Sequence, residues 1–325
     1  MTQPSTRSPT AEGVARAAVK LAAFLSETPL IEARIGDAIV WCKAESLQPV
    51  GAFKIRGAWH RLSDLSDAEK ARGVVGVSSG NHAQGVAWAA RRLGITAAIV
   101  MPVDAPAVKL ANTRALGAEV VLYDRPGGED RDAVAARLCA ERGATLVHAF
   151  ADPWVIEGQG TVGLEIAAQL AARGLGAPTR IIAPCGGGGL AAGLALALPD
   201  AQIVPVEPEG WDDVRLSLER GEIMPVPDSH FPTACDALQT PSTRPINFAV
   251  LKGRVPFGLM VTPAEVRAAQ RFAFSQLRLV LEPGGAAALA AALAGKVSLD
   301  GQTAIVLSGG NTDPASFAAV LSGSD

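Results

Sequence analysis

The sequence predicts an α/β protein of two lobes, each a parallel sheet with helices on both faces. Short apolar runs bounded by glycine or proline alternate along the chain with helical patterns, and this β-α-β order requires parallel strands joined by right-handed crossovers. The 325 residues are 49% hydrophobic but only 5% aromatic, and they include 34 glycines. That composition is typical of a compact α/β enzyme and not of a disordered or fibrous chain.

The first half of the chain begins with a helical pattern in which Ala, Val and Leu recur every three or four residues. Short apolar runs then alternate with further helical patterns, which predicts a first β-α-β series. The expected elements are a helix at 11–26, strands at 38–44 and 73–78, a helix at 81–93, a strand at 97–102, a helix at 107–116, a strand at 118–123, a helix at 130–142 and a strand at 145–148.

A second series follows, and its only irregular part is predicted at 208–239. The expected elements are a helix at 160–173, strands at 180–184 and 202–207 around a helix at 190–198, helices at 263–277 and 285–294, and a last strand at 303–307. We predict a small domain of residues 73–149 and a large cofactor-binding domain of residues 1–72 plus 150–325. The active site is expected in the cleft between the lobes.

Charge and cysteine content narrow the range of partners. The formal net charge is −3 and no basic patch stands out, so we expect no nucleic-acid partner. We expect no membrane association either, because no apolar stretch is long enough to span one and the N-terminus lacks the apolar region of a signal peptide. The four cysteines have neither zinc nor CxxC spacing, which indicates reduced thiols in a cytoplasmic protein.

Lys54 lies at the centre of the most informative stretch, Glu45-Ser-Leu-Gln-Pro-Val-Gly-Ala-Phe-Lys-Ile-Arg-Gly-Ala58. The stretch follows an apolar run and turns through Pro49 and Gly51 before a helical pattern begins. Most lysines that begin a helix are simply solvated. Two later glycine-bearing turns favour a different interpretation, in which Lys54 is the nucleophilic amine that captures pyridoxal phosphate as a Schiff base.

The second turn, Val77-Ser-Ser-Gly-Asn-His-Ala-Gln-Gly85, lies between a predicted strand and a predicted helix. Unpaired backbone N–H groups at such a helix start favour an anion, so Ser78, Ser79, Asn81 and His82 are candidates for binding a substrate carboxylate. The alternative is an ordinary Ser/Asn helix cap with no further role.

The third turn, Pro184-Cys-Gly-Gly-Gly-Gly-Leu190, also joins a strand to a helix. Without a Cβ at any of four consecutive positions, the backbone can wrap closely around a phosphate. The same glycines, with Glu207 about twenty residues later, imitate a dinucleotide-binding fingerprint and so an NAD-dependent oxidoreductase. That alternative leaves Lys54 and the second turn without a function.

Six motifs in the same order resemble the serine/threonine dehydratase and serine racemase family, pyridoxal-phosphate enzymes with the fold of the tryptophan synthase β chain. The resemblance runs from about residue 25 to the C-terminus, with no match to the regulatory domain that some threonine dehydratases carry. The motifs are 45–58, 78–85, Gly158-Gln-Gly-Thr-Val-Gly-Leu-Glu165, the glycines 186–189, Glu282-Pro283 and Leu307-Ser-Gly-Gly-Asn311.

The resemblance implies roles for individual residues. Lys54 would hold the cofactor as a Schiff base, Asn81 would hydrogen-bond the ring hydroxyl, and Ser308 would face the pyridine nitrogen. A serine there does not keep that nitrogen protonated, which favours rapid β-elimination over transamination. The implied cofactor-binding set is Phe53, Lys54, Asn81, Gly186, Gly187, Gly188, Gly189 and Ser308.

The implied reaction is β-elimination from a β-hydroxy amino acid, which yields a 2-oxo acid and ammonia in an enzyme that we expect to be a homodimer. L-threonine and L-serine are the expected substrates, with Lys54 removing the α-proton. Ser79 stands where serine racemases carry the proton-transfer residue of the opposite face, so serine racemase is the main alternative.

Two further features bear on metal and substrate. In the racemases and some dehydratases of the family, the segment that matches 207–213 binds Mg²⁺ or Ca²⁺. The resemblance therefore implies Glu207, Asp213 and the carbonyl of Trp211 as ligands, and an acidic loop without metal is the alternative. Ala237 replaces a glycine that many relatives have in the active site. Arg131 lies near the position where the racemase has an arginine able to meet a second carboxylate. Hydroxyaspartate and phenylserine therefore remain alternative substrates.

Overall fold

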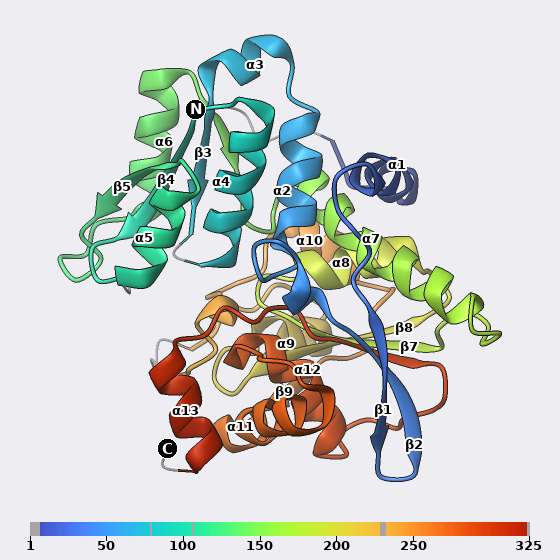
Figure 1. The fold of residues 1–325 in the computed structure, drawn as a ribbon. Helices are drawn as coiled ribbons and strands as arrows, with labels where there is room; N and C mark the ends of the chain where they lie inside the picture. Colours follow the sequence, from blue (N-terminus) through green and yellow to red (C-terminus); the bar gives the residue numbers. More distant parts are fainter. Residues whose placement is uncertain (1–6, 79, 106, 228–231, 324–325) are drawn as a thin grey trace.

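The computed structural model describes residues 7–78, 80–105, 107–227 and 232–323 and contains two sheets that lie in separate lobes (Figure 1). The smaller sheet has the order β5-β4-β3-β6, and all of its strands are parallel. Its strands are β3 (Val74–Val77), β4 (Ala97–Pro102), β5 (Glu119–Tyr123) and β6 (Thr145–Val147).

The larger sheet has the order β1-β2-β10-β7-β8-β9. Strand β1 was not predicted; it pairs with β2 in antiparallel register, from Leu30 opposite Lys43 to Ile35 opposite Ala38, so this sheet is mixed at one edge. All other neighbours run parallel. The strands are β1 (Leu30–Ile35), β2 (Ala38–Lys43), β7 (Arg180–Pro184), β8 (Gln202–Pro208), β9 (Leu259–Val261) and β10 (Thr303–Val306).

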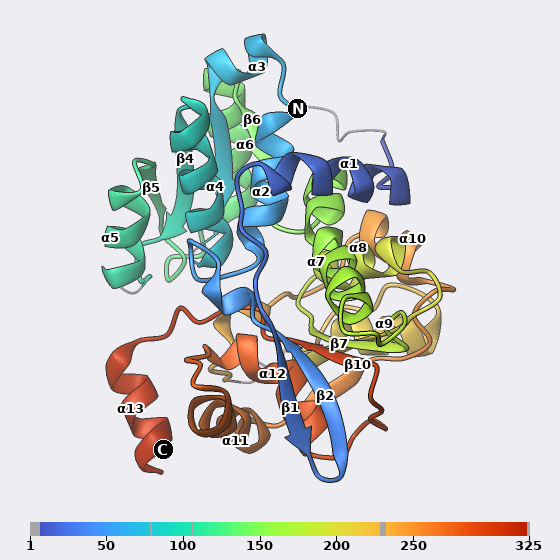
Figure 2. The ribbon, with the colours of Figure 1, turned by 45° about the vertical axis from the view of Figure 1, so that its right-hand side comes forward.

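Helices cover both sheets, and α2 and α7 lie where the two lobes meet (Figures 1 and 2). The helices of the first half of the chain are α1 (Ala11–Ala22), α2 (Lys54–Ser63), α3 (Asp67–Arg72), α4 (Asn81–Leu93), α5 (Ala107–Ala115) and α6 (Arg131–Arg142). Those of the second half are α7 (Pro153–Ala171), α8 (Gly189–Ala197), α9 (Asp213–Arg220), α10 (Pro245–Leu251), α11 (Pro263–Phe272), α12 (Pro283–Leu293) and α13 (Pro314–Ser322).

Most predicted elements are present, and the differences have local causes. Helix α7 begins at Pro153, seven residues before the prediction, because the carboxylate of Asp152 accepts the N–H groups of Trp154 and Val155 and proline is favoured in the first turn. The segment expected to be irregular contains α9, and α10, α13 and β9 were also missed. These elements have at most nine residues each, too few for a clear period.

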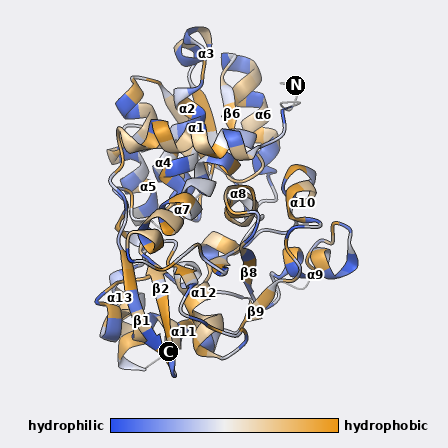
Figure 3. Cartoon of the chain, turned by 90° about the vertical axis from the view of Figure 1, so that its right-hand side faces the viewer, coloured by the Kyte–Doolittle hydropathy of each residue, from blue (hydrophilic) through white to orange (hydrophobic). Residues whose placement is uncertain are grey.

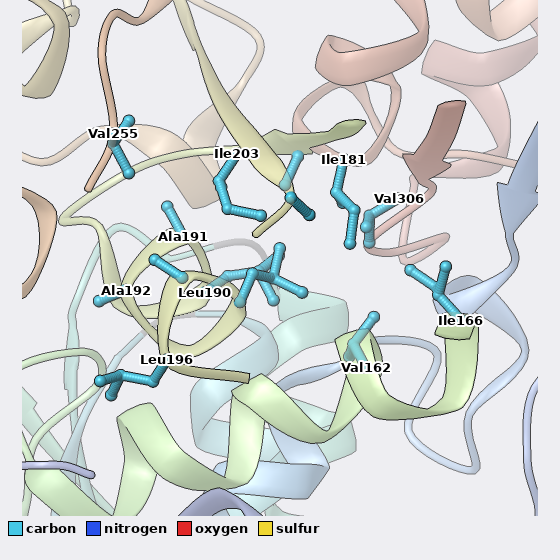
Figure 4. Close-up of a cluster of buried hydrophobic side chains, with 14 of the residues drawn as sticks. Val162, Ile166, Ile181, Leu190, Ala191, Ala192, Leu196, Ile203, Val255 and Val306 are labelled. Carbon is cyan, nitrogen blue, oxygen red and sulfur yellow. The ribbon is translucent and has the colours of Figure 1, made fainter. Parts of the chain in front are cut away.

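One hydrophobic core of the larger lobe lies between α7, α8 and the β7 side of the sheet (Figure 4), and another lies where α11 and α12 pack. Ile166 of α7, Leu190 of α8 and Ile181 of β7 are among the buried side chains of the first core. Helices α7 and α8 approach closely because each has a glycine at the contact: a Cβ on Gly160 would lie 2.5 Å from the carbonyl oxygen of Gly193. The outer helix α9, in contrast, shows hydrophilic and hydrophobic residues side by side (Figure 3).

We propose that the smaller sheet with α4, α5 and α6 forms the small domain of residues 73–149, as predicted, and that the remaining residues form the large domain. Both lobes connect through α2, which contacts α4 on one side and α7 on the other. Within the described ranges, no helix is both long enough and apolar enough to cross a membrane. All four cysteines are buried free thiols.

Candidate active site

Lys54 is the first residue of α2, and the turn before it is fixed against the end of β10. Ala52 forms an isolated antiparallel bridge with Gly309, and the N–H of Phe53 donates to the carbonyl of Ser308 at 3.1 Å. The helix start and the Ser308 segment are therefore held side by side. Two motifs separated by some 250 residues of chain thus meet at one point.

The amine of Lys54 has no carboxylate partner among the described residues. Its Nζ donates to the carbonyl oxygen of Ala149 at 2.8 Å and lies 5.2 Å from the centre of the Phe53 ring. Burial lowers the pKa of Lys54 from 10.5 to about 8, and the nearby Cys185 opposes this shift only in part. About a tenth of this amine is therefore neutral, and nucleophilic, at pH 7, far more than for a lysine with the usual pKa.

The second turn lies at the carboxyl end of β3, where α4 begins at Asn81. The hydroxyl of Ser78 accepts the N–H of Gly80 at 3.1 Å, and His82 bonds the carbonyl of Val147 through Nε2 at 2.9 Å. Burial, followed by the charge of Lys54, lowers the pKa of His82 to about 3, so this imidazole stays neutral. Ser79 lies outside the described residues.

Asn81 connects the turn to two other motifs. Its Nδ2 donates to Glu282 Oε1 at 2.5 Å, and its Oδ1 accepts from Asn311 Nδ2 at 2.8 Å. Burial raises the pKa of the Glu282 carboxyl to about 7, although the bond from Asn81 opposes the shift. The amide is thus oriented at both ends, and Nδ2 still carries a second hydrogen that can donate.

The four glycines lie between β7 and α8, and Gly188 has a φ of +86°, in the left-handed region. A Cβ on Gly187 would lie 2.3 Å from the Phe150 ring, and one on Gly189 would lie 3.0 Å from Phe150 Cβ. Only glycine fits this close approach, which leaves the backbone N–H groups at the start of α8 available to an anion. The loop therefore fits a phosphate.

One cavity brings the predicted motifs together. Its lining includes the reactive amine, both turns and the Ser308 segment, so the residues present fit pyridoxal phosphate: an amine for its aldehyde, a glycine cradle for its phosphate and an aromatic side chain beside the amine. The predicted residues that line this cavity are Phe53, Lys54, Ser78, Asn81, His82, Gly186, Gly187, Gly188, Gly189 and Ser308.

Arg131 also lines this cavity, as does Ala237. The cavity contains further polar residues that sequence reasoning missed, and two of them form ion pairs with partners elsewhere in the chain. Lys109 of α5 pairs with Asp236, which precedes Ala237, and Asp132 of α6 pairs with Arg244 at 3.7 Å. His148, at the end of β6, was likewise missed. Its place at the end of the strand predicted at 145–148 was a usable signal.

The acidic pair predicted to bind metal lies outside this cavity lining and has partners of its own. The carboxylate of Glu207 accepts the N–H groups of Val214 at 3.0 Å and Arg215 at 2.7 Å, at the start of α9. Asp213 Oδ2 accepts the N–H of Thr243 at 2.6 Å, while its buried Oδ1 has no hydrogen-bond partner among the described residues.

Burial raises the pKa of both carboxyls: that of Glu207 lies well above its usual value, with Asp213 the next cause, and that of Asp213 is about 7. In the described parts of the chain, no group of three His, Cys, Asp or Glu side chains could hold a metal ion. The carbonyl of Trp211 would therefore have to supply part of any coordination.

Comparisons with known proteins agree with the cavity chemistry. The family model described as "Pyridoxal-phosphate dependent enzyme" matches residues 22–309. The chain is similar to L-threo-3-hydroxyaspartate ammonia-lyase from Pseudomonas sp, at 39% identity over 95% of this chain and 98% of the relative.

Two solved structures have the same fold. A threonine deaminase from T.th. superposes with a TM-score of 0.86 at 41% identity, over 94% of this chain and 99% of that one. Maize serine racemase has a TM-score of 0.87 at 32% identity, over 98% of both chains. These matches confirm the predicted fold class and do not support the dinucleotide-binding alternative.

Proposed function

The chain belongs to the pyridoxal-phosphate-dependent enzyme family and is a lyase, and we propose that it converts a small β-hydroxy amino acid to a 2-oxo acid and ammonia by β-elimination. The observation that carries the proposal is the position of Lys54: a buried amine, with its pKa lowered to about 8, in a cavity lined by both the Ser78 turn and the four glycines.

When bound, pyridoxal phosphate withdraws electrons from Cα of the amino acid, so that an α-proton can leave. Gly186, Gly187, Gly188 and Gly189 would hold the phosphate, Phe53 would pack beside the ring, and Asn81 would donate to the ring hydroxyl. Ser308 would face the ring nitrogen. Its exposure is only 4%, so water competes little for that contact.

The protein's own groups handle substrate and proton. The N-terminus of α4, with Ser78, Ser79 and the backbone N–H of His82, binds the α-carboxylate, because unpaired N–H groups and the helix dipole favour an anion there. The neutral amine of Lys54 takes the α-proton, the β-hydroxyl leaves with one proton as water, and hydrolysis of the released enamine by a second water gives the 2-oxo acid and ammonia. His82 adds no positive charge, since its pKa is lowered to about 3. Racemisation needs a second group on the opposite face, and Ser79 is our candidate.

L-threonine and L-serine are the first-choice substrates, because the generic parts of the site require only an α-carboxylate and a β-hydroxyl. A second candidate, 3-hydroxyaspartate, is favoured by Arg131, which lines the cavity and can meet a second carboxylate. A panel assay tests both. We expect release of 2-oxo acid and ammonia from threonine, serine or hydroxyaspartate. Turnover of phenylserine alone would contradict the choice of substrates, and racemisation without elimination would contradict the reaction.

We also propose that a hard cation, Mg²⁺ or Ca²⁺, binds near Glu207, Asp213 and the carbonyl of Trp211. The partnerless Oδ1 of Asp213 supports it, as does the cost of placing two carboxylates together in a buried site. A chelator should then lower the Tm, and Mg²⁺ or Ca²⁺ should restore it, because a ligand of the folded state stabilises by mass action. An unchanged Tm, with no metal by elemental analysis, would leave an acidic loop without metal.

A further inference from the structure

His148 lies at the same edge of the smaller sheet as the Ser78 turn. It directly follows β6, and β6 pairs in parallel with β3, whose carboxyl end leads into that turn. Its imidazole lines the cavity that contains Lys54. A side chain in this position can therefore reach a bound amino acid, and none of the functions assigned above uses it.

Backbone hydrogen bonds determine which tautomer His148 adopts. Its Nδ1 accepts the N–H groups of Phe150 at 3.3 Å and Ala151 at 2.9 Å. A ring nitrogen that accepts from two donors carries no proton, so the neutral ring has its hydrogen on Nε2. The ring is also held in place by an edge-on contact with Phe150, at 4.6 Å between centres and 87° between planes.

The imidazole of His148 stays neutral across the physiological pH range. Burial, followed by the charges of Arg244, Lys54 and Arg131, lowers its pKa to about 4, and the charge of Asp132 opposes this shift. These groups come from α2, α6 and the start of α10, so positive charge predominates around the ring. A protonated, positively charged imidazole at position 148 would be repelled by these charges, whereas a neutral imidazole with an N–H donor is not.

The Nε2–H group of His148 is free to bind a ligand. It makes no hydrogen bond to any residue that the structure describes, and yet it is not sealed away from solvent, as the partnerless Nδ1 of His82 is. Arg131 and Asp132 line the same cavity. The Nε2–H donor and the guanidinium of Arg131, whose Nε lies 3.9 Å from Asp132 Oδ1, thus line one cavity, and both are donors suited to carboxylate oxygens.

We propose that His148 is a substrate-binding residue that donates its Nε2–H, beside Arg131, to a carboxylate at the side-chain end of the amino acid. This inference rests on the proposed function, because it concerns the second candidate substrate of the same site, 3-hydroxyaspartate, and so the class of amino acids with a second carboxylate. The neutral donor adds a directed hydrogen bond without adding charge next to Lys54.

Two variants separate binding from support of the turn. In His148→Asn, the amide oxygen lies near the place of Nδ1 and can still accept from Phe150 and Ala151, but the distal donor is gone. In His148→Gln, the amide nitrogen reaches about as far as Nε2, but no acceptor remains for the turn. The probes are L-aspartate and L-2-aminobutyrate, which have no β-hydroxyl to lose and differ in the second carboxylate.

Binding of both probes to the holoenzyme is measured by calorimetry. We expect the wild type to prefer aspartate and His148→Asn to lose about tenfold in aspartate affinity. His148→Gln should lose less than about threefold, and 2-aminobutyrate affinity should stay within about twofold in both variants. Equal affinity of the wild type for both probes would overturn the proposal.

The proposal would also be overturned if His148→Asn kept its affinity for aspartate. A loss of affinity for both probes in His148→Gln, with no loss in His148→Asn, would overturn it as well. Either result would mean that His148 supports the turn and does not bind the substrate. Neither probe needs to be eliminated in order to bind. If the enzyme prefers aspartate but releases no ammonia from any β-hydroxy amino acid, that result contradicts the proposed function and leaves the proposed role of His148 intact.

Discussion

Two lysines of this chain with buried amines, the fully buried Lys43 and the half-buried Lys54, lie in very different surroundings. Lys43, at the end of β2, donates to Glu165 Oε2 at 2.6 Å, to the carbonyl of Thr28 at 2.7 Å and to Gln169 Oε1 at 3.0 Å. Lys54 donates to a single backbone carbonyl. All three N–H donors of Lys43 are thus used, whereas the amine of Lys54 remains available for chemistry.

The surroundings of Lys43 form a matched network of charges. Arg56, two residues after Lys54 on α2, contacts Glu45 twice at 2.7 Å and Glu165 at 2.7 and 2.8 Å. Burial lowers the pKa of Lys43 as well, but Glu165 and Glu45 both oppose the shift. For Lys54 the only opposing influence is Cys185, a thiol whose own pKa is raised by burial.

The presence or absence of carboxylate partners distinguishes buried cations with a structural role from those with a reactive role. A buried cation surrounded by carboxylates orients the elements around it and keeps its proton, because its charge is compensated. A buried cation without a carboxylate has a lowered pKa and becomes a nucleophile. Helix α2 presents one residue of each kind, Arg56 and Lys54, within a single turn.

The largest expected effect is on activity. Lys54→Ala should reduce kcat by at least about a thousandfold, because no other described amine in the cavity can both bind the cofactor and move the α-proton. Lys109, the other lysine there, is paired with Asp236. Lys54→Arg is the matched control: it keeps the charge but cannot form the Schiff base, so it should be equally inactive. Substantial activity in either variant, by 2-oxo acid release, would contradict the assignment.

Removing a cation from the network should affect stability instead. Arg56→Met leaves Glu45 and Glu165 buried with less compensation, so the free energy of unfolding should fall by about 3–5 kcal/mol. Arg125→Met, at an exposed pair with Asp104, is the control and should change it by less than about 1 kcal/mol. Urea unfolding measures both. Equal effects would show that burial of the network contributes nothing.

The pH dependence of stability tests the lowered pKa directly. The folded-state pKa of Lys54 is about 8, below the usual 10.5, so between these values the unfolded chain binds a proton that the folded chain does not. Stability therefore rises with pH in this window. In cofactor-free protein, unfolding in urea at pH 7.5 and 10 should show wild type gaining about 2 kcal/mol relative to Lys54→Met. If the stabilities of the wild type and Lys54→Met change in parallel with pH, the pKa of Lys54 is not lowered in the folded protein.

The smallest expected effect concerns substrate choice. Arg131→Ala should lower kcat/KM for 3-hydroxyaspartate about tenfold and leave threonine within about twofold, because only the former has a second carboxylate. Arg137→Ala, on the same helix but with 64% of its side chain exposed, should change neither. An equal loss for both substrates in Arg131→Ala would show that Arg131 supports the cavity and does not select the substrate.

The sequence was sufficient for those parts of the site that are contiguous in the chain. Lys54, the Ser78 turn and the four glycines each lie where a strand leads into a helix, so local pattern located them. Lys109 and Asp132 could not be found in this way, because they reach the cavity wall from two separate helices and leave no spacing in the sequence. Only His148, at the end of a predicted strand, carried a local signal. The antiparallel pairing of β1 was missed because register depends on a partner strand.

The most direct test of the central claim is to identify which lysine holds the cofactor. Borohydride reduction of the holoenzyme, followed by proteolysis and mass mapping, should place the pyridoxyl group on the peptide that contains Lys54. The peptide that contains Lys43 should remain unmodified, since Glu165 pairs with that amine. A pyridoxyl group on Lys43 or on any other lysine, with Lys54 unmodified, would contradict the distinction between the two buried lysines.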